Sequence, residues 1–124
     1  MTKLSTNLHP GSDSLFGLFD RQANATPDRI AVVDLEGETR YQTLRQHAEA
    51  MHIALLANDI APNAVVVILM ERSADLVAVM LGVLRAGCAF VALDPKDPPE
   101  RLAQLMARCN AAALLTDAPS TLVD

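Results

Sequence analysis

The chain has 124 residues, of which 51% are hydrophobic, 3% are aromatic and 20% are charged, and its formal net charge is −5. This composition fits one globular domain or part of a larger one, and it excludes a disordered chain because half of the residues are apolar. The acidic balance argues against nucleic acid as a partner. The longest apolar run, Leu76–Leu84, is shorter than the ~18 residues of a membrane span, and the first residues lack a secretory signal, so we expect a cytoplasmic protein with no membrane partner.

The beginning of the chain predicts an arm followed by a helix. Residues 1–13 are polar and are predicted to form a flexible arm, whereas residues 14–124 are predicted to form the folded part. A short helix is predicted over 15–25, with Ser12 or Ser14 as its cap and a Thr-Pro pair after it.

A hairpin and a longer helix come next. Residues 29–41 predict a β-hairpin, because a β-branched run is followed by a turn sequence with a central glycine. Apolar residues then recur every three or four positions from Leu44, which predicts a helix ending near Asn58. Thr39 and Gln42 are three residues apart and are expected to form a capping box at its start.

The second half of the chain predicts alternating strands and helices. Apolar runs at 65–70, 88–93 and 112–116 predict three strands, of which the first is apolar at every position, as in a parallel strand covered on both faces. The helix after the first strand is expected to be capped by Ser73 and ended by Gly87 in a left-handed conformation.

The helix between the second and third strands is expected to start with Asp97 as its cap and Pro98 at its first position. Its apolar residues lie at helical spacing along one face: Leu102, Leu105, Met106 and Cys109. The β-α-β-α-β order implies adjacent parallel strands joined by right-handed crossovers. The predicted class is therefore α/β, a partial parallel sheet with helices on its faces, preceded by a helix and a hairpin.

Polar residues follow two of the predicted strands and are the candidates for a site. Met70–Ser73 follows the first strand, and Asp94-Pro95 with Asp97 follows the second. Ligands bind at the carboxyl ends of parallel strands, and the amino end of a helix can bind an anion. The alternative is structural, with Glu71 and Arg72 making contacts at a strand–helix turn and the aspartates forming turns and a cap.

The sequence lacks the usual phosphate-binding glycine loops and the G-x-S-x-G nucleophile turn. Cys88 and Cys109 have no C-x-x-C spacing and are interpreted as buried small hydrophobes. His9, His47 and His52 are scattered along the chain, and His47 and His52 are interpreted as ordinary surface residues. No catalytic, cofactor-binding or metal-binding residue is assigned.

Several motifs together resemble the amino-terminal part of the adenylation domain of nonribosomal peptide synthetases, in the adenylate-forming, AMP-binding superfamily. The opening is similar to the family pattern LF…QA…TPD-x-IAVV over 15–33, and the segment 39–44 lies where the family has L-[TS]-Y-x-E-L. Residues 69–73 resemble L-x-E-R-S. Residues 84–95 resemble L-K-A-G-x-A-Y-V-P-L-D-P, and Pro98 with 100–102 resembles the continuation Y-P-x-E-R-L.

The resemblance covers about residues 15–116, with departures. Arg40 and Thr43 replace the family's Ser/Thr and Glu, and Ala92 replaces a proline in the second motif, where Phe90 and Asp97 also replace tyrosines. The resemblance implies amino-acid activation with ATP and Mg²⁺, in which aminoacyl-AMP forms and is transferred to a carrier-protein thiol. The family's ATP-binding loop, T-S-G-T-T-G-x-P-K-G, does not occur in these 124 residues, and neither does its amino-acid pocket, so no cofactor is expected to bind this chain and no residue is carried over.

Three functional hypotheses follow. The first is a subdomain of an adenylating enzyme, inactive alone, whose partner is the remainder of the domain or a synthetase and carrier protein. The second is an adenylation-like protein that acts as a non-catalytic docking or regulatory module, and the third is an unrelated small α/β enzyme, which would need a catalytic pair that the sequence does not show. The all-apolar helix predicts exposed hydrophobic surface in the isolated chain, and hence self-association or a bound partner. The amino acid that is activated does not follow from these residues.

Overall fold

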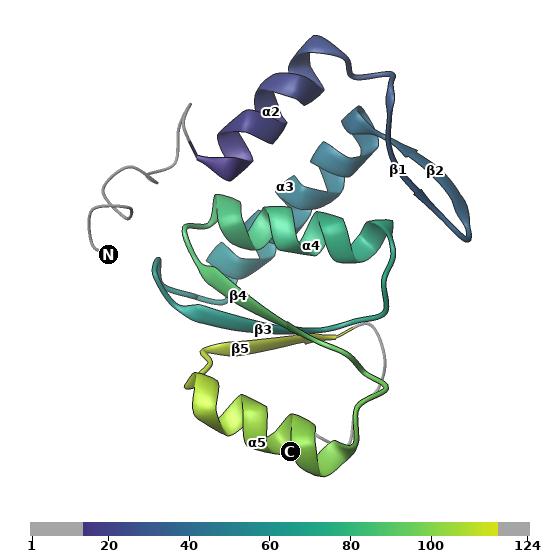
Figure 1. The fold of residues 1–124 in the computed structure, drawn as a ribbon. Coiled ribbons are helices and arrows are strands. Elements are labelled where there is room, and N and C mark those ends of the chain that lie inside the picture. The colour runs from purple at the N-terminus through teal and green to yellow at the C-terminus, as the bar shows by residue number, and fades with distance from the viewer. Residues whose placement is uncertain (1–13, 117–124) are drawn as a thin grey trace.

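The computed structural model describes residues 14–116, so the predicted arm over 1–13 lies outside the described residues. A helix and a hairpin come first, and alternating strands and helices follow (Figure 1). The elements are α2 (Leu15–Ala25), β1 (Ile30–Asp34), β2 (Gly37–Arg40), α3 (Tyr41–Ala57), β3 (Val65–Leu69), α4 (Ala74–Arg85), β4 (Ala89–Leu93), α5 (Pro99–Cys109) and β5 (Ala113–Thr116). This order confirms the predicted α/β class.

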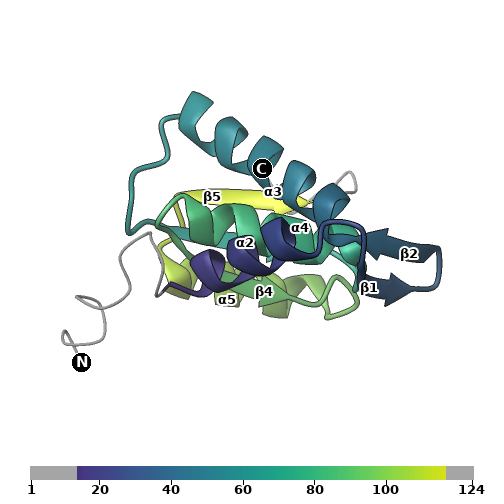
Figure 2. The ribbon, with the colours of Figure 1, turned by 90° about the horizontal axis from the view of Figure 1, so that it is seen from above.

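The parallel sheet has β3 at its centre, in the order β4-β3-β5. Both neighbours run parallel to β3. Strand β5 pairs with β3 on the side opposite β4, so the expectation that successive strands are adjacent is wrong for β4 and β5. Helix α4 covers one face of the sheet and α5 covers the other (Figure 1). Helix α3 packs against α4, and the antiparallel hairpin of β1 and β2 projects from one end of the molecule in both views (Figures 1 and 2).

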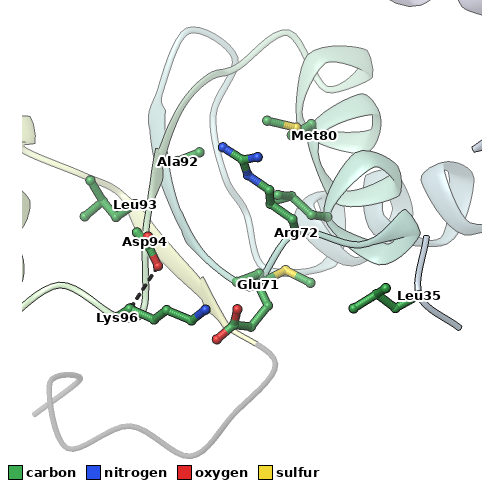
Figure 3. Close-up of a pocket in the computed structure, with 10 residues that line it drawn as sticks. Leu35, Glu71, Arg72, Met80, Ala92, Leu93, Asp94 and Lys96 are labelled. Atoms are coloured by element: carbon green, nitrogen blue, oxygen red, sulfur yellow. Dashed lines mark hydrogen bonds between the residues drawn. The ribbon is translucent and has the colours of Figure 1, made fainter. Parts of the chain in front are cut away.

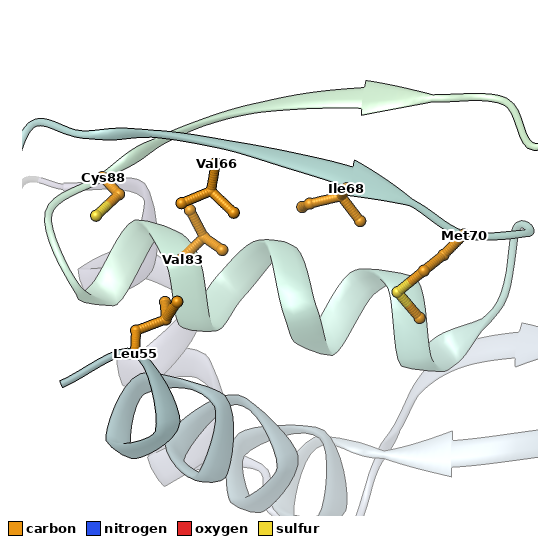
Figure 4. Packing of buried hydrophobic residues seen from close by; sticks show 6 residues of the cluster. All are labelled: Leu55, Val66, Ile68, Met70, Val83 and Cys88. Atoms are coloured by element: carbon orange, nitrogen blue, oxygen red, sulfur yellow. The ribbon is translucent and has the colours of Figure 1, made fainter. Parts of the chain in front are cut away.

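The core forms around β3, as its uninterrupted apolar sequence predicts. Val66, Val67 and Ile68 have no exposed surface. Val66 and Ile68 face α4 and pack with Val83 of that helix and Leu55 of α3 (Figure 4). Because side chains alternate along a strand, Val67 lies on the opposite face, which α5 covers.

The predicted boundaries of α2 and α4 are confirmed. Ser14 and Ser73 each accept a hydrogen bond from the backbone N–H three residues ahead, at 2.9 and 3.1 Å. Gly87 follows α4 with φ +79°, a conformation that glycine adopts without steric cost. The four residues of the predicted α5 stripe are the least exposed ones of that helix: Leu102, Leu105, Met106 and Cys109.

Two predicted caps are wrong. Thr39 lies in β2, the cap position of α3 is Arg40, and no side chain caps this helix. Instead, the N–H groups of Tyr41 and Gln42 donate to the backbone carbonyls of Arg29 and Pro27, at 2.9 and 3.0 Å. The connection between α2 and β1 therefore satisfies the first two N–H groups of α3, in place of a capping box.

At α5 the boundary lies one residue later than predicted. Pro98 is the cap residue and Pro99 the first helical residue, and no side chain caps the helix. The N–H of Asp97 donates to the carbonyl of Asp94 at 3.0 Å, so Asp97 belongs to the preceding turn. Either proline has the φ angle that the first helical position requires, which is why the sequence pattern did not distinguish them.

The two cysteines differ in burial. Cys88 is buried, its thiol donates to the carbonyl oxygen of Ala61 at 3.4 Å, and burial raises its pKa. Cys109 is only half-buried, so the prediction that both are buried is wrong for this residue, which lies on α5 at the outer layer of the fold.

We expect this difference to appear in thiol labelling. One thiol per native chain should react rapidly with Ellman's reagent, and it should be removed by Cys109→Ser. Cys88 should react only after unfolding in urea, because its thiolate is disfavoured and its sulfur is covered. Rapid reaction of two thiols in the folded chain would contradict this assignment.

Candidate functional site

The carboxyl ends of β3 and β4 meet the amino end of α4 around an open cavity. Leu69, the last residue of β3, lies opposite Leu93 of β4 and Thr116 of β5. The cavity has a volume of about 680 Å³ and opens at this edge of the sheet (Figure 3). It is lined by Leu35, Met70, Glu71, Arg72, Leu76, Met80, Ala92, Leu93, Asp94 and Lys96.

The structure thus brings together three of the polar residues that the sequence singled out. Glu71 and Arg72 come from the β3–α4 turn, and Asp94 comes from the end of β4. Asp97 does not line the cavity, because the turn after β4 carries it onward to α5. Glu71, Arg72 and Asp94 are exposed, so each is accessible at the cavity surface.

The contacts around Asp94 and Ser73 are structural. The Asp94 carboxylate accepts a hydrogen bond from the Lys96 N–H at 2.9 Å, which closes a local turn (Figure 3). The Ser73 hydroxyl caps α4 and donates to the carbonyl of Glu71 at 3.3 Å. These two side chains shape the strand ends, as the structural interpretation of the sequence proposed.

Asp34 is a residue of this region that sequence reasoning missed. It ends β1, and its carboxylate accepts hydrogen bonds from the N–H of Ala74, at 2.9 Å, and of Glu36, at 3.0 Å. These backbone N–H groups, Ala74 first, lower the pKa of Asp34 below its usual value of 3.8. The hairpin is therefore tied to the amino end of α4, where a negative charge is favourable.

Replacing Asp34 by alanine should lower the free energy of unfolding near neutral pH. The lowered pKa means that the ionised carboxylate is favoured in the folded state, so its stabilisation is present above pH 3.8 and is lost as the pH falls through the lowered pKa. Urea unfolding of the wild type and Asp34→Ala should give a difference that shrinks below pH 3.8.

Two variants control this measurement. Asp34→Asn keeps an oxygen acceptor and should retain part of the stability at pH 7 while losing the pH dependence. Glu38→Ala, an exposed residue of the adjoining strand, should change little. A difference between wild type and Asp34→Ala that stays constant down to pH 2 would contradict the role of the carboxylate charge.

A second hollow of about 750 Å³ adjoins the first, between the hairpin and α4. The two hollows share Leu35, Arg72, Leu76 and Met80, and together we call them the α4 groove. The second hollow is also lined by Val32, Val33, Asp34, Ser73 and Val77. The groove is therefore mainly apolar along α4, with charged residues at the strand ends.

The remaining candidates for chemistry do not gather into a site. In residues 14–116, no group of three or more His, Cys, Asp or Glu side chains could hold a metal ion, so we assign no Mg²⁺ ligand to this part of the chain. His47 is exposed, and His52 is half-buried with its Nδ1 covered.

Among the helices within residues 14–116, none has the length and apolar character that a membrane span requires.

A parallel sheet with helices on both faces and a hollow at the strand ends is the architecture of the ligand-binding α/β folds. Within this class, residues 19–124 match the sequence profile of the AMP-binding enzyme family. The chain belongs to this family.

The relatives are large synthetases. The chain is 42% identical over 108 residues to phosphinothricin tripeptide synthetase PhsB of Streptomyces viridochromogenes, covering 86% of this chain and 9% of PhsB. Among solved structures, it superposes on the nonribosomal peptide synthetase FmoA3 with a TM-score of 0.78 and 31% identity, covering 86% of this chain and 12% of FmoA3.

The fold also matches the N-terminal subdomain of Klebsiella oxytoca NpsA, with a TM-score of 0.79 and 23% identity, covering 89% of this chain and 29% of that one. The segment thus corresponds to part of the N-terminal subdomain of the adenylation domains of nonribosomal peptide synthetases. It spans less than a tenth of PhsB and less than a third of the NpsA subdomain.

Proposed function

We propose that this chain serves as a scaffold in an adenylation domain that activates an amino acid for nonribosomal peptide synthesis. In the complete domain, the amino-acid carboxylate attacks the α-phosphate of ATP, pyrophosphate leaves, and the aminoacyl group of the adenylate is transferred to a carrier-protein thiol. The observation that carries the proposal is the match of residues 19–124 to the AMP-binding family, a segment that contains the hydrophobic core around β3.

The motif residues support this role by what they contact. In the segment 69–73, Ser73 caps α4 and Leu69 is buried beside its neighbouring strands. In the segment 84–95, Gly87 ends α4 and Asp94 closes the turn after β4. These residues hold the strand ends in place, and we assign none of them a chemical step, so we expect the chain alone to be inactive.

Three finer points belong to the same proposal. Residues 14–124 would form one folded unit with the remainder of the domain, and a synthetase with its carrier protein would be the partner. The cytoplasm, where ATP is available, is the implied location. ATP and Mg²⁺ would bind the complete domain through residues other than those described.

The alternative is a non-catalytic docking module for a synthetase. The observation that favours it is the set of exposed apolar side chains on the hairpin and helices, which include Val33 at 70% and Leu56 at 57% exposure. Both functions use an apolar contact surface. Only the scaffold function requires that an adenylation domain stay active when this chain replaces the matching segment of that domain.

Amino-acid-dependent ATP–pyrophosphate exchange separates these functions. The purified chain should be folded by circular dichroism and show no exchange above the blank. A graft that replaces the matched segment of PhsB by residues 15–116 should keep exchange within about tenfold of the parent measured beside it. Exchange by the chain alone would contradict the proposed inactivity, and a folded but inactive graft would contradict the scaffold function.

A further inference from the structure

We propose that the α4 groove is the docking surface for the remainder of the adenylation domain. This inference rests on the proposed function and adds which face of the chain meets the rest of the domain. It follows from the shape of the groove, its place at the sheet edge and the distribution of its charges.

The groove offers a concave apolar surface. Leu76 and Met80 of α4 are half-buried and line both hollows. The hairpin forms the other wall, where Val33 is 70% exposed and Leu35 is fully exposed. Such side chains gain most from a partner, because removing apolar surface from water favours association.

The position of the groove favours the remainder of the same domain as its occupant. The last described strand, β5, ends at Thr116, which pairs with Leu69 at the edge where the groove opens. The sheet is parallel, so all three strands leave it at this edge. The NpsA subdomain, with the same fold, has more than two thirds of its chain outside the matched part.

The charges fit a buried interface with a polar rim. Arg72 lies where the two hollows join, and Glu71, Asp94 and Lys96 surround the sheet-edge hollow. Apolar floors with charged rims are typical of protein interfaces. By contrast, Ile53 and Leu56 are exposed on α3 and line neither hollow of the groove.

Two matched double variants test the proposal. Val33→Glu with Leu35→Glu places charges on the groove wall, whereas Ile53→Glu with Leu56→Glu places them on α3. All four residues are more than half exposed, so both variants of the isolated chain should keep the wild-type circular dichroism spectrum. Both pairs are also made in the PhsB graft.

In the graft, the groove pair (Val33→Glu with Leu35→Glu) should lower pyrophosphate exchange at least tenfold and increase cleavage of the domain in limited proteolysis. The α3 pair (Ile53→Glu with Leu56→Glu) should leave the exchange rate and the proteolysis pattern unchanged. The proposal is overturned if the α3 pair has the larger effect, or if neither pair changes the active graft.

These outcomes separate the docking surface from the function. An inactive wild-type graft contradicts the scaffold function, whereas an active graft that tolerates the groove pair contradicts only the docking surface. Light scattering of the isolated chain gives a further check. A stable dimer that only the groove pair dissociates, together with an unaffected graft, would assign the groove to a second copy of the chain and overturn the proposal.

Discussion

Gly82→Ala should lower the free energy of unfolding by about 2 kcal/mol, and Gly82→Val should leave little folded protein. Gly82 lies in α4 at its closest approach to α3. A Cβ atom at this position would lie 2.6 Å from the Cβ of Met51 and 2.8 Å from the carbonyl oxygen of Ala48. Neither atom is at the end of a flexible side chain, so the two helices would have to separate. Urea unfolding followed by circular dichroism measures the loss.

The effect predicted for Gly82→Ala is opposite in sign to the usual effect of this substitution in a helix. In an ordinary helix, Gly→Ala is stabilising by about 1 kcal/mol, and the exposed reverse change Ala103→Gly in α5 should show this normal preference. The double variant Gly82→Ala with Met51→Ala should remain destabilised, because alanine keeps the clashing Cβ. A Gly82→Ala protein as stable as the wild type would refute the close packing of α3 and α4.

Ile68→Ala should cost about 2–5 kcal/mol of unfolding free energy, the largest loss that we expect from a single truncation. Ile68 lies in the central strand, is fully buried, and packs in the cluster that joins β3 to α4 and α3 (Figure 4). Its removal leaves a cavity between the sheet and the helices that the neighbouring strands prevent from closing. Equilibrium unfolding in urea is the measurement.

Ile53→Ala is the matched control for this truncation. The same side chain is removed, but Ile53 is 56% exposed on α3, so its loss should change the unfolding free energy by less than about 0.5 kcal/mol. Equal losses at the two positions would mean that β3 is not the centre of the core.

The elements that the sequence predicts well are those whose signals are local. The apolar run of β3, the serine cap and glycine end of α4, and the helical spacing from Leu102 to Cys109 each lie within about fifteen residues, and the structure confirms all three. The wrong caps have a different origin. The first turn of α3 is satisfied by carbonyls of Arg29 and Pro27, and such contacts depend on how the hairpin folds back.

The candidate site was predictable only in part. Glu71, Arg72 and Asp94 were expected at the strand ends because parallel strands end at one edge, and they do line one cavity. The role of Asp34 could not be predicted, because its partner Ala74 is 40 residues further along the chain. The groove between hairpin and helix depends on the same long-range contact, so it too required the structure.

The sheet order has a consequence for how the chain assembles. Val66 pairs with Phe90 of β4 and with Ala113 of β5, and the second pairing closes a loop about twice as long. Each doubling of loop length adds about 0.6 kcal/mol of closure entropy. We therefore expect the unit of β3, α4 and β4 to form first during synthesis, with β5 joining it last.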